Sequence, residues 1–247
     1  MRIGGFEFSP GLWPTLATLA ILPVLLALGA WQFERAVWKQ GLIDKEAEIS
    51  QLAPAALLDV VDSPGPADYR PVYMAGSYDL GRQLLLDNRI HKRRPGYEVL
   101  TPLRLKGQQA VVLVNRGWVP LGPSRADLPD LPGPATEQLV TGTIARLPEK
   151  IFRLDAAEEP HAGWPQVIQY IDLELIGERL GQAVLPVVVL LDMKDTNGFA
   201  RDWRPVYGIM PDKHRAYAMQ WFSLALVLVI IYAGVNTRRI GKQESGN

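Results

Sequence analysis

Two long runs without a charged residue lie near the two ends of the chain. The first extends from Phe8 to Phe33 and the second from Ala216 to Thr237. Each run exceeds the roughly 20 apolar residues that an α-helix needs to cross the hydrocarbon core of a bilayer. The pattern predicts transmembrane helices over residues 11–33 and 214–237, which flank a domain of residues 34–213.

Aromatic residues stand near the ends of both runs, as expected of side chains that anchor a helix at the headgroup level. They are Trp13 and Trp31 in the first run, and Tyr217, Trp221 and Tyr232 in the second. A buried core helix is a poor alternative, because such helices rarely lack charge over so many residues. A cleaved signal peptide is a closer alternative for the first run, since small residues occur between Ala27 and Ala30. The run is long for a signal peptide and only Arg2 precedes it, so we expect an uncleaved anchor.

Basic residues beside the runs predict the orientation. Arg238, Arg239 and Lys242 follow the second run, which places the C-terminus in the cytoplasm despite Lys213 and Arg215 on the other side. The charges around the first run slightly oppose this topology. Two spans put both termini on one side, so residues 1–10 and 238–247 are expected in the cytoplasm. No Arg- and Ser-rich presequence is present, which favours a bacterial inner membrane with a periplasmic domain.

Between the runs, the pattern first predicts an amphipathic helix from Glu34 to Leu52 that continues the first span. From Arg70 it changes to short runs rich in Val, Tyr, Thr and Ile, which is typical of antiparallel strands. A hairpin turn is expected at Lys106-Gly107, an irregular connection between Pro120 and Pro134, and a short helix capped by Asp172. The expected strands are Pro71 to Tyr78, Gln83 to Asn88, Tyr97 to Leu105, Ala110 to Trp118, Gln138 to Ala145, Val167 to Ile171 and Val184 to Leu191. The expected fold class is α+β and sheet-dominated; closure into a barrel stays open.

Composition excludes several functions. The chain has 26 basic and 26 acidic residues and no cysteine, which rules out disulfides, a C-x-x-C-H haem attachment and a thiolate copper site. Its three histidines lack any short metal-ligand spacing, which disfavours a zinc hydrolase. No glycine-rich phosphate loop or G-x-S-x-G motif is present. We therefore do not expect an enzyme.

Three groups of polar residues in the middle of the chain are weaker candidates. The run from Arg89 to Arg94 suits anionic lipid headgroups or carboxylates of a partner or ligand, or is a solvated turn. The segment from Asp155 to His161 offers metal ligands, although a solvated acidic loop explains it with less assumption. Asp87, His91 and Arg116 are available for acid–base chemistry, which leaves a membrane-anchored enzyme acting on lipid or cell-wall precursors as an alternative.

His214 is the more informative histidine, because it stands directly before the second run. By helical spacing, Tyr217 and Trp221 lie close to its face. A neutral imidazole there can ligate a haem iron while aromatic rings pack on the macrocycle, and Arg215, Lys213 or Arg35 can pair with the propionates. A simple headgroup anchor is the alternative interpretation.

Five segments in sequence resemble the surfeit-locus protein family of cytochrome c oxidase assembly factors. The resemblance runs from about Leu28 to Trp221, and its order and spacing both fit. The segments are Leu28-Gly-Ala-Trp-Gln32 with Arg35 and Trp38-Lys39, Tyr69-Arg-Pro-Val72 with Gly76, Pro95-Gly-Tyr97 leading to Leu100-Thr-Pro102, Val114-Asn-Arg-Gly-Trp-Val-Pro120, and His214-Arg-Ala-Tyr-Ala-Met-Gln-Trp221.

This resemblance implies an assembly factor that helps haem a reach subunit I of a haem-copper oxidase, with haem A synthase as a further partner. In some bacterial members the histidine that opens the second span is implicated in binding haem a. The implied cofactor residues are thus His214, Arg215, Tyr217 and Trp221, with His214 as ligand to the iron. The alternative is a scaffold that stabilises a haem-receptive subunit I and binds no haem. Nucleic acid is not an expected partner outside the cytoplasm.

Overall fold

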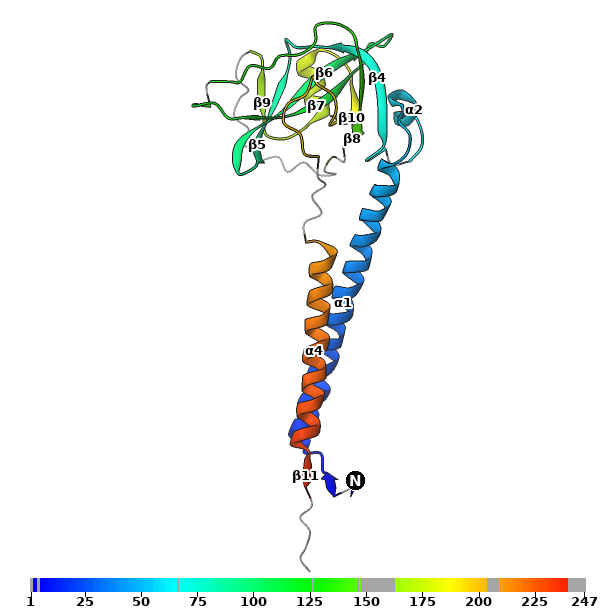
Figure 1. Cartoon of the computed structure of the whole chain (residues 1–247), viewed down its shortest axis with the longest axis vertical. Helices are drawn as coiled ribbons and strands as arrows, with labels where there is room; N and C mark the ends of the chain where they lie inside the picture. Colours follow the sequence, from blue (N-terminus) through cyan, green and yellow to red (C-terminus); the bar gives the residue numbers. More distant parts are fainter. Residues whose placement is uncertain are drawn as a thin grey trace, which may run out of the picture. The chain divides into compact units, whose positions relative to one another are not determined.

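The computed structural model describes residues 2–3, 5–65, 67–125, 127–145, 147, 163–203 and 209–239. The chain divides into two compact units. One consists of Met1–Lys45 together with Val206–Asn247, and the other is Glu46–Pro205. The first unit contains two long helices and the second contains the sheet (Figure 1).

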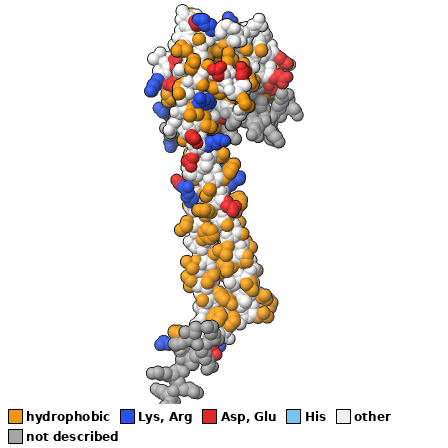
Figure 2. Space-filling model, turned by 90° about the vertical axis from the view of Figure 1, so that its right-hand side faces the viewer, with side chains coloured by type: hydrophobic (Ala, Val, Ile, Leu, Met, Phe, Trp, Pro, Cys, Tyr) orange, Lys and Arg blue, Asp and Glu red, His pale blue; other side chains and the backbone are white. Residues whose placement is uncertain are grey.

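The two long helices are α1 (Leu12–Ser50) and α4 (Pro211–Val235). Helix α1 is continuous, which confirms that the first apolar run extends into the amphipathic segment. Helix α4 ends at Val235, two residues short of the predicted end of the span, because Thr237 already belongs to a strand. Both helices are long and apolar enough to span a bilayer. Only 6% of the most apolar 18-residue stretch of α1 is buried, and 11% of that of α4. Such exposed apolar surfaces, visible in Figure 2, are unlike core helices of a soluble domain.

Helices α1 and α4 pack against each other in antiparallel fashion along a seam. The least exposed residues recur at alternating steps of three and four, which is the spacing of a two-helix seam. Small residues permit the close approach. A Cβ atom on Gly29 would lie 2.6 Å from the ring of Phe222. The seam residues near its charged end are Gly29, Gln32, Ala36 and Lys39 on α1, and His214, Ala218, Trp221 and Ala225 on α4.

The other end of the helix pair is closed by a small antiparallel sheet. Strands β1 (Arg2–Ile3), β2 (Phe6–Phe8) and β11 (Thr237–Arg239) pair in that order. Side-chain contacts between the two helices adjoin this sheet. Thr15 Oγ1 lies 2.9 Å from the hydroxyl of Tyr232, and Gly11 N donates to Asn236 Oδ1 at 2.7 Å. Both ends of the described chain therefore lie at the same end of this unit, as two spans require.

The second unit is built on an eight-stranded mixed sheet with the order β3-β4-β8-β10-β7-β6-β5-β9. Most neighbours are antiparallel, but β10–β7, β3–β4 and β5–β9 are parallel. The strands are β3 (Ala55–Ala56), β4 (Pro71–Tyr78), β5 (Leu84–His91), β6 (Arg94–Leu105), β7 (Val111–Pro120), β8 (Gln138–Ile144), β9 (Gln166–Ile168) and β10 (Val184–Leu191). The sheet bends until three residues of β4 also pair with β6, yet it is not a closed barrel, and β3 and β9 are its edges.

The seven predicted strands are all present, and β4 and β10 match their predicted ranges residue for residue. The predicted turn at Lys106-Gly107 joins β6 to β7, with Gly107 at φ 73°. Two expectations need correction. The sheet is mixed rather than wholly antiparallel, and β5 and β6 extend through the basic run to His91 and Arg94. That extension follows from a tight turn at Lys92-Arg93, where both residues have positive φ.

Two short helices and a long connection cover the sheet. Helix α2 (Leu57–Val61), which the sequence pattern did not predict, places Leu57 in the core beside β4. Helix α3 (Leu173–Leu180) begins as expected, with Asp172 accepting a hydrogen bond from Leu175 N at 3.2 Å, and buries Ile176 and Leu180. The described residues of 121–137 form neither helix nor strand, in agreement with the proline pattern.

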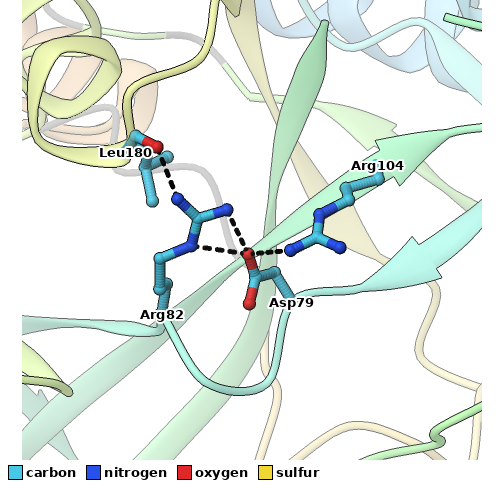
Figure 3. A network of polar contacts seen from close by, with 4 residues as sticks. All are labelled: Asp79, Arg82, Arg104 and Leu180. Carbon is cyan, nitrogen blue, oxygen red and sulfur yellow. Dashed lines mark hydrogen bonds and ion pairs between the residues drawn. The ribbon is translucent and has the colours of Figure 1, made fainter. Parts of the chain in front are cut away.

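An ion network holds the turn between β4 and β5 (Figure 3). Oδ2 of Asp79 accepts from Arg82 Nε and from Arg104 Nη2, each at 2.7 Å, and Arg82 also donates to the carbonyl of Leu180 at the end of α3. Burial alone would raise the pKa of Asp79, but hydrogen bonds from the two guanidinium groups outweigh it and lower the pKa below its ordinary value. The network thus joins a turn, a strand and a helix.

We expect Asp79→Asn to destabilise the sheet unit by about 1–2 kcal/mol at pH 7, because it removes the charge that both guanidinium groups contact. Since the pKa of Asp79 is lower in the folded state, its contribution is present above its ordinary pKa and is lost as the pH falls through the folded value. Urea unfolding of the full chain in detergent at pH 7 and pH 3 measures both effects. Glu178→Gln, on the exposed face of α3, is the control and should change neither value.

Candidate functional site

The candidate site lies where the helix pair leaves its charge-free region. His214 is only 7% exposed and belongs to the first turn of α4, opposite Gln32 of α1. The two side chains meet, with His214 Nδ1 2.7 Å from Gln32 Oε1. This hydrogen bond joins residues that are 182 positions apart in the chain. It is a direct polar link between the two helices.

The hydrogen bond defines which nitrogen of His214 is available. An amide oxygen accepts but does not donate, so Nδ1 carries the proton. In the neutral ring the lone pair then resides on Nε2. Nε2 is buried and has no hydrogen-bond partner among the residues that the structure describes. An oriented imidazole with one nitrogen fixed and the other free is the arrangement that metal-ligating histidines show.

The predicted neighbours of His214 have different environments. Trp221 is half-buried in the seam, and Tyr217 is 47% exposed. The guanidinium of Arg215 is already engaged, since Nη1 donates to Asp212 Oδ1 at 2.9 Å and Nη2 to Gln40 Oε1 at 3.4 Å. The structure therefore brings an imidazole and two aromatic rings onto one stretch of α4, and it gives Arg215 partners of its own.

These residues fit a haem in one respect: a buried imidazole nitrogen has no hydrogen-bond partner among the described residues. Because Nε2 is covered, an iron can reach it only when neighbouring side chains move apart. His214 would hold the iron, and Tyr217 and Trp221 would offer aromatic surface to the macrocycle. The described residues contain no cluster of three or more His, Asp or Glu side chains that suits a protein-ligated metal ion.

Arg116, which the sequence offered with Asp87 and His91 for acid–base chemistry, belongs to the interior of the sheet unit. It is 1% exposed in β7 and donates to the carbonyls of Asn197 and Pro132 and to Oε1 of Gln83. Its guanidinium also lies 4.9 Å from the ring centre of Phe199 and 5.2 Å from that of Tyr78. This segment is domain structure, because Arg116 ties two loops to the sheet.

The other candidates do not form a common site. Asp87 pairs with Arg125, and the ring of His91 packs on Trp118 with centres 5.3 Å apart. His91 lies in the hairpin of β5 and β6, whose exposed tip carries Lys92, Arg93 and Arg94, a surface we call the basic tip. Within the described ranges, none of these three cations makes an ion pair. The acidic segment ending at His161 lies outside the described residues.

Comparison with known proteins gives the context of this geometry. A sequence model described as the SURF1 family matches residues 19–226, which include both the His214 region and the whole sheet unit. The chain belongs to the SURF1 family. A SURF1-like protein of Drosophila melanogaster is 25% identical over 90% of this chain and 77% of its own length. Surfeit locus protein 1 of Takifugu rubripes is 25% identical over 83% of this chain and 90% of its own length.

A third relative has a more specific name. The Saccharomyces cerevisiae protein named Cytochrome oxidase assembly protein SHY1 is 26% identical over 76% of this chain and 50% of its own length. The resemblance found from sequence segments alone is thereby confirmed at the level of the family. Together with the two candidate spans, these relatives indicate association with a membrane.

The pairing of Gln32 with His214 is the feature of the site that sequence reasoning missed. It is the sole glutamine of the first charge-free run, and a polar amide there needs a partner when water is excluded. A search for polar residues at the alternating three and four spacing of the two runs would have paired Gln32 with His214. Both polar residues are visible in the sequence, but their pairing can be predicted only when the antiparallel register of the two helices is known.

Proposed function

We propose that this chain is an assembly factor for a haem-copper (cytochrome c) oxidase, and that it handles haem a as cargo. Membership of the SURF1 family and the name of the yeast relative support the assembly role. The observation that carries the haem role is the buried His214 ring, with Nδ1 bonded to Gln32 and Nε2 without a partner in the described part of the chain. Haem a supplies a Lewis-acidic iron for that nitrogen and a large apolar plane for the neighbouring rings.

In this proposal the two helices are the working part of the molecule. Cargo held at the boundary of a bilayer reaches an oxidase subunit without passing through water, and subunit I is the recipient. Haem A synthase donates the haem, which again moves along the bilayer boundary without passing through water. We place both termini in the cytoplasm of a bacterium and the sheet unit in the periplasm, supported by the basic residues that follow α4. Cleavage after Ala30 would remove the contacts of Thr15 and Gly29 with α4, so an uncleaved anchor fits better.

A second candidate function is a scaffold that binds subunit I and never binds haem. The basic tip favours it, because three exposed cations that make no ion pair with any described residue suit the carboxylates of a protein partner. Both turn residues of this tip have positive φ without being glycine or asparagine, which costs stability and is typical of functional turns. In this alternative His214 serves only to join the helices.

The test is purification of the full chain from cells that also make haem A. We expect a Soret band with the wild-type chain and its loss in His214→Ala, because no other histidine of the described chain lies in the helix pair. Subunit I that co-purifies with the variant is measured in the same sample. A wild-type chain without haem, or a variant that retains as much, would disprove haem handling. Capture of subunit I that survives loss of His214, in a chain that never carries haem, would establish the scaffold.

A further inference from the structure

The seam divides the helix pair into two flanks, and one of them is defined by contacts. Arg215 of α4 reaches Gln40 of α1, with Nη2 and Oε1 3.4 Å apart. On the same side Phe222, two turns further along α4, lies against Gly29. We call this side the Phe222 flank. This flank contains the described partners of Arg215, so the cation next to His214 on this side already has polar contacts.

The opposite side follows from helical geometry, and we call it the Tyr217 flank. Lys213 and Tyr217 are four residues apart, so they share a face of α4 that points away from Arg215. Trp31 and Arg35 share a face of α1 in the same way. The contact of Arg215 with Gln40 places these two residues on one side of the helix pair. Lys213 and Tyr217 on α4, and Trp31 and Arg35 on α1, therefore lie together on the opposite side. All four lie within about one helical turn of the level at which Gln32 meets His214.

The Tyr217 flank has an ordered change of chemistry along the helix axes. On α1, Trp31 precedes the end of the charge-free run and Arg35 follows it. On α4 the order is reversed with the chain direction, since Lys213 precedes the second run and Tyr217 lies inside it. Two aromatic side chains therefore lie on the bilayer side of His214 and two cations on the water side. This is the pattern that an amphipathic ligand requires at an interface.

The cations of the two flanks also differ in their partners. Arg215 is paired with Asp212. Arg35 lies over the ring of Trp38 at 4.9 Å, and neither it nor Lys213 makes an ion pair within the described part of the chain. Trp31 and Tyr217 are 54% and 47% exposed. The Tyr217 flank thus combines exposed aromatic rings with cations that make no ion pair among the described residues.

We propose that the Tyr217 flank is the binding face of the helix pair. It takes a planar amphipathic molecule that carries carboxylates. Arg35 and Lys213 bind the carboxylates at the water edge, and Trp31 and Tyr217 pack on the apolar plane. Arg215 is not part of the site. The inference rests on the proposed haem function, and it adds which face and which cations receive the cargo.

The experiment titrates the full chain in detergent with iron protoporphyrin IX and, separately, with its dimethyl ester, which has no carboxylates. Absorption in the Soret region measures binding. We expect the double variant Arg35→Gln with Lys213→Gln to bind the acid roughly 3- to 30-fold more weakly and the ester as the wild type does. The matched control, Lys45→Gln with Arg215→Gln, removes the same charge elsewhere and should bind both probes normally. Arg35→Lys with Lys213→Arg keeps the charges and should retain binding.

Two results would overturn this assignment while leaving haem handling intact. One is an equal loss in the control variant, which would reflect net charge rather than a site. The other is an acid that binds the Arg35 and Lys213 variant as tightly as the wild type. A wild-type chain that binds neither probe would instead overturn the proposed function itself. The two failures are therefore distinguishable in one series of titrations.

Discussion

Replacing Arg116 by methionine should destabilise the sheet unit by roughly 3–5 kcal/mol. The substitution keeps most of the aliphatic volume but removes the donors that bind the carbonyls of Asn197 and Pro132. Each acceptor that is left buried without a donor costs about 1–3 kcal/mol. Domains of this size are stable by only ~5–15 kcal/mol, so a large part of the fold's stability depends on one side chain.

The environment of Arg116 explains why no substitute fits well. Burial lowers the pKa of Arg116, and none of the carboxylates in the described chain makes an ion pair with it. Burial also raises the pKa of Tyr78 to about 12, so the phenol beside the guanidinium is neutral at pH 7 and offers only its ring. The cation is therefore held by carbonyl dipoles and aromatic faces. Only a planar group with several donors matches that arrangement.

Urea unfolding of the full chain in detergent, followed by tryptophan fluorescence, measures the effect. Arg116→Lys should lie between the wild type and the methionine variant, because an ammonium reaches fewer of the acceptors. Arg104→Met is the control for loss of a partly exposed arginine and should cost about 1 kcal/mol or less. A methionine variant as stable as the wild type would contradict the structural role and would return Arg116 to the list of candidate binding residues.

Local pattern was sufficient to predict most elements of the fold. Strand β10 is a continuous apolar run and β4 alternates in exposure, so both have clear limits in the sequence. The cap at Asp172 and the glycine at 107 are short-range signals of the same kind. Pairing partners are not local. The parallel pairing of β10 with β7 and of β5 with β9 depends on which strands the long connections bring together.

The candidate site was predictable only in part, because it also combines local signals with contacts between distant residues. His214 was visible as a histidine at the edge of an apolar run. Its state, with one nitrogen held and the other free, depends on Gln32, which is distant in sequence and meets it only through the antiparallel register of the two helices. The pairing of Arg215 with Asp212 and Gln40 likewise follows from tertiary geometry. Residue type therefore indicated the ligand, and packing determined its availability.

Replacing Gln32 by leucine should weaken haem binding by the helix pair roughly 10- to 100-fold, the usual cost of losing the group that orients a ligating histidine. Leucine suits an apolar helix surface, so the helices should still pair, but Nδ1 of His214 then lacks its acceptor. The ring is free to adopt the other tautomer or to rotate, and Nε2 is no longer preset as the ligand. Soret titration of the full chain with iron protoporphyrin IX measures the change.

Gln32→Glu separates orientation from helix packing. A carboxylate still accepts from Nδ1 and accepts more strongly, so it should restore binding and lower the midpoint potential of the bound haem, because a more basic imidazole stabilises the ferric iron. Gln40→Leu removes the other glutamine near the seam, which contacts Arg215 rather than His214, and should leave both affinity and potential unchanged. If Gln32→Leu and Gln40→Leu weaken binding equally, Gln32 contributes only to the packing of the two helices. An unchanged potential in Gln32→Glu would mean that the hydrogen bond to His214 does not act on the iron.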